Sequence, residues 1–214
     1  MNSNKQEKII YLLRHGSVLH ADEERRYIGE TDLPLSIEGV EQAHLLHSEF
    51  SGKEISAVIC SNLIRCVDTA RIVCRGLTDN IIVRADLREI SMGEWEGKSF
   101  REIVQNYPGE YQKRGENIST YRIPGAESFK ECQARVMRAF FDIMESIKGN
   151  VLIVGHAGVN RLLLCYILGM PIENIFRISQ DYACVNIVVS NQSKYRIALL
   201  NGSCRCGKEA LSIY

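Results

Sequence analysis

Two side chains that could hold and attack a phosphate group follow an apolar stretch near the start of the chain. The five apolar residues 9–13 run directly into Arg14, His15 and Gly16. An arginine offers a planar cationic fork that matches a phosphate, and a histidine offers a nitrogen nucleophile near neutral pH. Glycine lets the backbone turn closely around a ligand. The stretch therefore predicts a buried strand that ends in residues suited to phosphate chemistry.

The same kind of residue follows two further apolar runs. Arg65 comes just after residues 57–60, and His156 comes just after residues 151–154. Ligands of open α/β sheets bind beyond the carboxyl ends of the strands, so we expect these two residues to converge with Arg14 and His15. A buried cationic cluster is costly unless an anion neutralises it, and guanidinium groups suit a phosphate dianion. The pattern lacks the acidic sets that hold Mg²⁺ in many phosphotransferases, so we expect chemistry without metal or cofactor.

The elements that must position these residues alternate between short apolar runs and helical spacing. The expected strands are residues 9–13, 57–60, 81–83 and 151–154, followed by a hairpin of residues 183–190 and 195–200. Helical spacing runs over residues 40–50, 63–77, 129–147 and 159–168, with Ser36 and Ser61 as N-caps of the first two helices. This order predicts an α/β fold, a three-layer α/β/α sandwich with a mostly parallel central sheet.

Two segments without a clear period are expected at the same edge of the sheet. Residues 84–126 hold several glycines and aromatic residues and predict short helices at about 99–106 and 109–114. We expect a small lid insert at about residues 90–125, within a single domain that comprises residues 1–214. The loop-like segment 26–35 follows the Arg-His-Gly turn and should lie over the same strand end.

The composition excludes several functional classes. The 214 residues are 45% hydrophobic and carry 26 Lys plus Arg against 26 Asp plus Glu, which argues against a nucleic-acid coat or a polybasic membrane binder. The polar residues 1–8 and the lack of an apolar stretch of about 18 residues predict a cytoplasmic chain with no signal peptide and no membrane span. The eight scattered cysteines should be reduced thiols, and only Cys204 and Cys206 form a C-x-C pair, a weak metal signal. Nothing in the sequence sets the oligomeric state.

Five sequence blocks, in this order, resemble the histidine phosphatase superfamily, the phosphoglycerate-mutase-like group. They are Leu-Arg-His-Gly at 13–16, Ser-Asn-Leu-Ile-Arg-Cys-Val-Asp-Thr-Ala at 61–70, Leu-Arg-Glu-Ile-Ser-Met-Gly-Glu-Trp-Glu-Gly at 87–97, Pro-Gly-Ala-Glu-Ser at 124–128 and Gly-His-Ala-Gly at 155–158. Together they span roughly residues 9–160. A further segment, Arg-Tyr-Ile-Gly-Glu-Thr-Asp-Leu-Pro-Leu-Ser at 26–36, is similar to the α-ribazole phosphatase branch in particular.

The resemblance implies a phosphomonoesterase that works through a phosphohistidine. It makes His15 the nucleophile, whose other ring nitrogen should donate to a backbone carbonyl. It makes Arg14, Arg65 and His156 the groups that hold the phosphate oxygens. It makes Glu89 the acid that protonates the leaving alkoxide and then takes a proton from the attacking water, with its own proton retained near an apolar lid.

Rival acids and two departures from the family pattern also concern the site. Glu94 and Glu96 are the rival acids, and Glu89 is favoured over both. Val18 stands where the family usually has a hydroxyl residue, which removes one phosphate contact unless Ser17 replaces it. Ala157 stands where glycine is usual, but its backbone N–H stays available to a phosphate.

For the substrate, the resemblance implies a small phosphate ester, with α-ribazole 5′-phosphate hydrolysed to α-ribazole in cobalamin biosynthesis as the first choice. It implies substrate contacts at Ile28, Gly29 and Thr31. Residues 92–125 hold five basic and five acidic residues, so no second anion site is evident there and phosphoglycerate should be a poor substrate. The five aromatic residues of this stretch either stack on a flat heterocycle or form the lid's own core.

Other interpretations stay open. Within the family, they are a phosphoglycerate mutase and a broad-specificity sugar or nucleotide phosphatase. Outside enzymes, a module that binds phosphorylated ligands without turnover has Val18 as its only support. A P-loop is suggested by the Gly-x-x-x-x-Gly-Lys pattern at 202–208, but Glu follows where Ser or Thr would hold Mg²⁺.

Overall fold

A six-stranded mixed sheet with strand order β3-β2-β4-β1-β5-β6 forms the centre of the molecule. The computed structural model describes residues 7–19, 24–191 and 194–203. The strands are β1 (Lys8–Arg14), β2 (Ala57–Ser61), β3 (Ile81–Arg84), β4 (Val151–Gly155), β5 (Val185–Asn191) and β6 (Lys194–Gly202). Strands β1 to β4 run parallel, whereas β5 is antiparallel to β1 and β6 is antiparallel to β5. The mostly parallel sheet and the terminal hairpin are confirmed.

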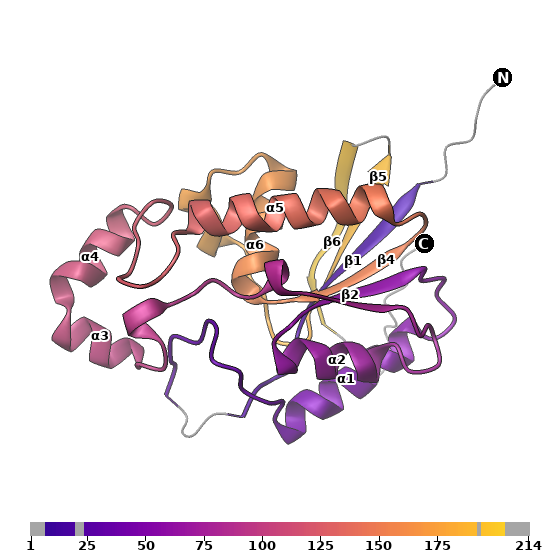
Figure 1. Cartoon of the computed structure of the whole chain (residues 1–214), viewed down its shortest axis with the longest axis horizontal. Coiled ribbons are helices and arrows are strands. Elements are labelled where there is room, and N and C mark those ends of the chain that lie inside the picture. Colours follow the sequence, from indigo (N-terminus) through magenta and orange to yellow (C-terminus); the bar gives the residue numbers. More distant parts are fainter. Residues whose placement is uncertain (1–6, 20–23, 192–193, 204–214) are drawn as a thin grey trace.

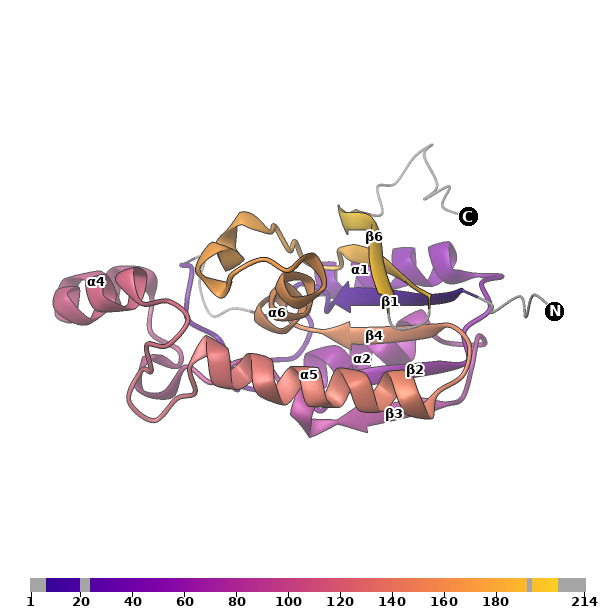
Figure 2. The same cartoon turned by 90° about the horizontal axis from the view of Figure 1, so that it is seen from above.

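Helices cover both faces of this sheet and complete three layers (Figures 1 and 2). The four helices are α1 (Ile37–Phe50) and α2 (Ile64–Val73) on one face, and α5 (Phe129–Ser146) and α6 (Ala157–Leu168) on the other. Successive strand residues point to opposite faces, so Ile10 and Leu12 belong to the core under α5 and α6, while Tyr11 and Leu13 belong to the core under α1 and α2. A strand covered on both faces must be apolar throughout, which explains the run at residues 9–13. The α/β/α sandwich is confirmed.

The first two helices begin differently. Ser36 is the N-cap of α1, and its side chain accepts the backbone N–H of Gly39, as expected. The expectation that Ser61 caps α2 is wrong, because Leu63 is the N-cap and α2 begins at Ile64. Ser61 ends β2, and its Oγ accepts the Leu63 N–H at 3.3 Å within the turn between strand and helix.

Residues 85–127 leave the sheet and return to it as a helical insert, called the insert below. It contains the 3₁₀ turns η1 (Ala85–Leu87) and η2 (Gly93–Trp95) and the helices α3 (Phe100–Asn106) and α4 (Pro108–Glu116). Figure 1 shows α3 and α4 beyond one end of the sheet. The ring of Tyr27 stacks on Phe100 with centroids 4.1 Å apart and meets Trp95 at 5.2 Å. These rings therefore form a small core of the insert, while Tyr107 and Tyr111 are exposed.

The end of the chain passes from α6 through η3 (Ile172–Arg177) and residues 178–184 into β5. No helix in the described ranges is long and apolar enough to cross a membrane. The six cysteines within those ranges are free and buried, and no group of three or more His, Cys, Asp or Glu side chains there is arranged to hold a metal ion. Cys204, Cys206 and the last residues of the P-loop-like segment lie outside the described residues. The assignment of residues 1–214 to a single domain stays a prediction.

Candidate active site

The carboxyl ends of β1, β4 and β2 bring four of the predicted site residues to one edge of the sheet. Arg14 of β1 is in register with Gly155 of β4, and the backbone N–H of His15 donates to the Gly155 carbonyl at 3.0 Å. His156 follows Gly155 and is the N-cap of α6. β2 flanks β4 on the other side, and α2, which follows it, carries Arg65 in its first turn. Chain order and parallel pairing together explain the convergence.

His15 is a buried imidazole with one nitrogen bonded to the backbone. Its Nδ1 lies 2.8 Å from the carbonyl oxygen of Gly16. A carbonyl oxygen only accepts, so Nδ1 carries the proton and Nε2 keeps its lone pair. Burial, followed by the positive charges of Arg14 and Arg65, holds the pKa of His15 well below its usual value. His15 is therefore an unprotonated potential nucleophile at neutral pH, with the backbone hydrogen bond that the family resemblance implies.

The turn after His15 depends on a close approach between two backbones. A Cβ atom at Gly16 would lie 2.5 Å from the Gly39 carbonyl oxygen in α1, which leaves no room for a side chain. Thr69 Oγ1 accepts the Gly16 N–H at 3.1 Å and donates to the Arg65 carbonyl at 2.7 Å. Through Thr69, the turn that presents His15 is tied to the helix that presents Arg65.

His156 lies opposite His15, with ring centroids 5.2 Å apart. Its Nδ1 accepts a hydrogen bond from Arg65 Nε at 3.3 Å, so the proton of the neutral ring is on Nε2. Cys66 Sγ lies 3.4 Å from that Nε2. Burial, followed by the charge of Arg65, holds the pKa of His156 well below its usual value. His156 therefore offers the site a neutral N–H donor.

The guanidinium group of Arg65 is held by a loop that crosses the sheet edge. Arg65 is only 1% exposed, and its Nη1 and Nη2 donate to the carbonyl oxygens of Thr31 and Gly29, each at 2.7 Å. These contacts fix the direction of the guanidinium group without neutralising its charge. Arg65 has no ion-pair partner in the part of the chain that the structure describes.

The guanidinium group of Arg14 is held by the segment before β5. Its Nη1 donates to the Gln180 carbonyl at 2.7 Å, and its Cζ lies 3.7 Å from the centroid of the Tyr182 ring. The Tyr182 ring also lies 5.6 Å from the ring of His15. Arg14 Nε is buried without a hydrogen-bond partner. Arg14 likewise has no carboxylate partner among the described residues, so two uncompensated positive charges flank the two histidines.

Glu89 reaches the site from the segment that leads into the insert. It is 7% exposed, and its carboxylate accepts the N–H groups of Gly158 at 3.0 Å and Val159 at 3.3 Å, in the first turn of the helix that follows His156. A Cβ atom at Gly158 would lie 2.6 Å from Glu89 Oε1, so glycine allows this approach. The expected apolar surroundings of Glu89 are wrong, because the carboxylate faces backbone donors at a helix N-terminus.

The rival acids have different positions. Glu96 Oε1 accepts the N–H groups of Gly29 at 2.8 Å and Thr31 at 2.9 Å, together with the Thr31 hydroxyl at 2.7 Å. Glu94 is exposed. Glu96 and Arg65 thus hold the same two loop residues from opposite sides, through their N–H groups and their carbonyls. The substrate contacts at Ile28, Gly29 and Thr31 stay a prediction, but Gly29 and Thr31 are placed beside Arg65.

The two departures from the family pattern have clear positions. Val18 is buried and forms an isolated β-bridge with Leu35, so its side chain helps close the loop before α1. The Ser17 N–H donates to Gln42 Oε1 at 2.8 Å. Ala157 is the first residue of α6. Phosphate contacts from Ser17 and Ala157 stay predictions.

Residues 178–184 border the site, and the sequence analysis missed them. The Arg14 N–H donates to the Cys184 carbonyl and the Ala183 N–H donates to the His15 carbonyl, each at 3.1 Å. Gln180 and Tyr182 then face Arg14, as described above. The segment has no period of its own, and the only usable signal is that it precedes a strand that pairs with β1.

Known proteins resemble the chain in sequence and in fold. The model of the family described as histidine phosphatase superfamily (branch 1) matches residues 10–203. The chain is 31% identical over 194 residues, 90% of its length and 95% of the relative, to the adenosylcobalamin/alpha-ribazole phosphatase of Escherichia coli. It is 30% identical over 197 residues, 92% of its length and 97% of the relative, to a Hydrogenobacter thermophilus protein named for phosphoserine phosphatase activity. The crystal structure of the alpha-ribazole phosphatase from Shigella flexneri matches with a TM-score of 0.84 and 30% identity over 94% of this chain and 99% of that one.

Proposed function

This chain belongs to the histidine phosphatase superfamily (branch 1), and on this basis we propose that it hydrolyses phosphate monoesters through a phosphohistidine formed on His15. One observation carries the proposal: the Nε2 lone pair of His15 lies among Arg14, Arg65 and His156, whose positive charges or N–H groups have no carboxylate partner among the described residues. A phosphate dianion is the ligand that such a set neutralises, and His15 is the group that can attack it.

The proposed reaction has two steps. First, His15 Nε2 attacks phosphorus, the N–P bond forms as the P–O bond to the alcohol breaks, and the leaving alkoxide takes a proton from Glu89. Second, water attacks phosphorus, its proton passes to Glu89, and the N–P bond breaks to return the His15 lone pair. Arg14, Arg65 and His156 hold the non-bridging oxygens and stabilise the charge that shifts onto them in both steps.

Further contacts complete the proposed phosphate site. The Ala157 N–H at the start of α6 and the Ser17 hydroxyl are proposed as additional phosphate donors. The proposal includes no metal ion or cofactor, because the two arginines supply the positive charge that Mg²⁺ supplies in other phosphoryl-transfer sites.

For the substrate we propose α-ribazole 5′-phosphate, hydrolysed to α-ribazole in cobalamin biosynthesis. Two relatives that cover nearly the whole chain carry that activity in their names. The segment that resembles this branch contains Ile28, Gly29 and Thr31, and two of these residues bind Arg65. We propose that this loop contacts the organic part of the ester.

The test is a comparison of kcat/KM for α-ribazole 5′-phosphate, p-nitrophenyl phosphate, 3-phosphoglycerate and AMP. We expect release of inorganic phosphate from all four and the highest value for α-ribazole 5′-phosphate. Isomer formation from 3-phosphoglycerate without phosphate release would identify a mutase instead. Phosphate binding without turnover of any ester would identify a binding module.

We also propose that the enzyme acts in the cytoplasm. All six cysteines within the described ranges are unpaired and buried, which suits a reducing compartment. Its partner there is a small phosphate ester, not a nucleic acid or a membrane.

A further inference from the structure

A third arginine is bound to the same segment as Arg14. Arg161, in the second turn of α6, donates from Nε to the Ile178 carbonyl at 2.7 Å. Arg14 Nη1 donates to the Gln180 carbonyl at 2.7 Å. Two residues of chain span at most about 7 Å, so these two carbonyls hold the two guanidinium groups near one another at the carboxyl edge of the sheet.

Neither guanidinium group is neutralised by the protein. Arg14 and Arg161 have no ion-pair partner among residues 7–19, 24–191 and 194–203, whereas Arg84, Arg88 and Arg135 all pair with carboxylates. Burial, followed by the positive charge of Arg14, lowers the pKa of Arg161. Like charges held together are unfavourable unless an anion lies between or beside them. The missing anion must therefore come from a ligand.

The orientation of Arg161 suits an oxyanion. Because Nε is committed to Ile178, the Nη1 and Nη2 pair remains without a described protein partner. These two parallel N–H groups match the two oxygens of a carboxylate or phosphate. The Arg161 Cζ lies 5.8 Å from the centroid of the Phe176 ring, which is 58% exposed and offers an apolar surface beside the charge.

We propose that Arg161 forms a second oxyanion subsite beside the phosphate site, so that preferred substrates carry a further carboxylate or phosphate group about 7 Å from the transferred phosphorus. The inference rests on the proposed function, because it places the transferred phosphate on Arg14 and His15. In a ribotide, the matching group is a second phosphate on another sugar hydroxyl. In a small hydroxy acid, it is the carboxylate. The balanced charge of residues 92–125 did not reveal this subsite, because the arginine comes from α6.

Two matched pairs of esters test the subsite. 3-Phosphoglycerate differs from glycerol 3-phosphate by a carboxylate, and adenosine 3′,5′-bisphosphate differs from AMP by a 3′-phosphate. We expect the ester with the second anion to have the higher kcat/KM in at least one pair, by about tenfold or more. The pair that shows the effect identifies the subsite as one for carboxylate or for phosphate.

Variants connect that preference to the residue. Arg161→Gln should lower the ratio of the two kcat/KM values by about tenfold or more, and Arg161→Lys should lower it less, because lysine keeps the charge but not the paired donors. The matched control is Arg177→Gln, which removes an exposed arginine of η3 and should leave the ratio unchanged.

Three results would overturn the proposal: ratios near one in both pairs for the unmodified enzyme, a ratio that Arg161→Gln does not change, or equal losses on both members of a pair, which would make Arg161 only a brace for residues 178–184. Failure of the proposed function has a different signature. If p-nitrophenyl phosphate and every ester stay unhydrolysed, calorimetric binding of the same pairs still tests the subsite, and Arg161→Gln should then weaken only the ester with the second anion.

Discussion

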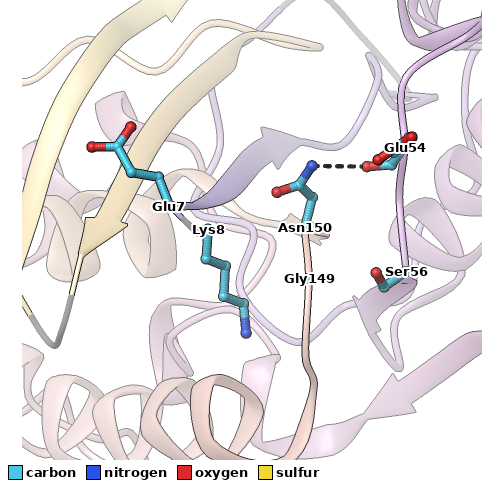
Figure 3. Close-up of a pocket in the computed structure, with 6 residues that line it drawn as sticks. All are labelled: Glu7, Lys8, Glu54, Ser56, Gly149 and Asn150. Carbon is cyan, nitrogen blue, oxygen red and sulfur yellow. Dashed lines mark hydrogen bonds between the residues drawn. The ribbon is translucent and has the colours of Figure 1, made fainter. Parts of the chain in front are cut away.

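The two ends of the parallel strands hold their polar residues in opposite ways. At the amino end, Figure 3 shows a small cavity of about 120 Å³. Asn150 beside it accepts the Ile9 N–H at 2.9 Å and donates to the Glu54 carbonyl at 3.0 Å, and Lys8 Nζ donates to the Ile147 carbonyl at 2.6 Å near the end of α5. The lining residues are Glu7, Lys8, Glu54, Ser56, Gly149 and Asn150.

At the carboxyl end, Arg14, Arg65 and Arg161 bond to backbone carbonyls, but no described carboxylate neutralises them. The cavity at the amino end has side chains of both signs, and its central amide is used within the protein. The difference shows that the existence of a cavity says less about function than charge of one sign without a partner. Polar groups satisfied internally stabilise the fold, whereas charges left uncompensated indicate a ligand.

The largest expected effect comes from removing the proposed nucleophile at the carboxyl end. His15→Ala should lower kcat by about 10⁴-fold or more, because no other group can form the covalent intermediate. Vanadate should still bind, since Arg14, Arg65 and His156 remain. Acid-quench labelling of the unmodified enzyme should place phosphate on His15, and label on a cysteine would refute the assignment.

Glu89→Gln should have the next largest effect. Turnover of alkyl phosphates should fall roughly 10²–10⁴-fold, the usual range for a lost general acid. The loss should be smaller for p-nitrophenyl phosphate, whose leaving group needs little protonation. Glu94→Gln is the matched control, and it should leave both substrates unaffected. Equal losses on alkyl and aryl esters with Glu89→Gln would contradict the proposed role.

At the amino end, the same kind of substitution should affect stability and not catalysis. Asn150→Ala removes the bonds to Ile9 and Glu54 and should lower the free energy of unfolding by about 1–3 kcal/mol, measured in urea, with kcat/KM unchanged. Asn106→Ala, at an exposed helix end, should change that free energy by less than about 0.5 kcal/mol. A large loss of kcat/KM in Asn150→Ala would remove the contrast between the two ends.

The smallest effect concerns the response of the buried histidines to acid. The pKa of His156 in the folded protein is well below its ordinary value of 6.5, mainly because of burial. Below about pH 6.5 the unfolded chain therefore binds the proton first, and the free energy of unfolding falls by up to about 1.4 kcal/mol per pH unit. Above that pH both states are neutral and this loss is absent.

Urea unfolding between about pH 7.5 and about pH 5.5 measures this response. His156→Gln should weaken the dependence on pH, whereas His44→Gln, at an exposed position of α1, should retain it. A steeper dependence in His156→Gln would mean that the imidazole is charged when buried.

The sequence predicted the parts of the site that local pattern determines. Arg14 and His156 directly follow runs that had to be buried strands, and chain order places those strand ends at one edge. Arg65 was accessible to the same reasoning, because it lies in the first turn of a helix that follows a strand. Periodicity therefore supplied the frame, and the family resemblance supplied Glu89.

Contacts between distant segments could not be predicted in this way. Gln180 and Tyr182 reach Arg14 only because β5 pairs antiparallel with β1, and no local period encodes that pairing. The role of Glu96 was missed for a related reason, since its partners Gly29 and Thr31 are backbone groups, to which any residue type contributes equally.

That last contact has an evolutionary consequence. The loop over the phosphate site is held at residues 29 and 31 largely through main-chain atoms, by Arg65 on one side and Glu96 on the other. Gly29 is constrained, because a Cβ there would lie 2.3 Å from the Ile90 carbonyl oxygen. The neighbouring side chains, Ile28 and Glu30, take no part in that grip. Mutations at these two positions can therefore accumulate while the phosphate platform stays intact, so a lineage can exchange one ester for another without rebuilding its catalytic machinery.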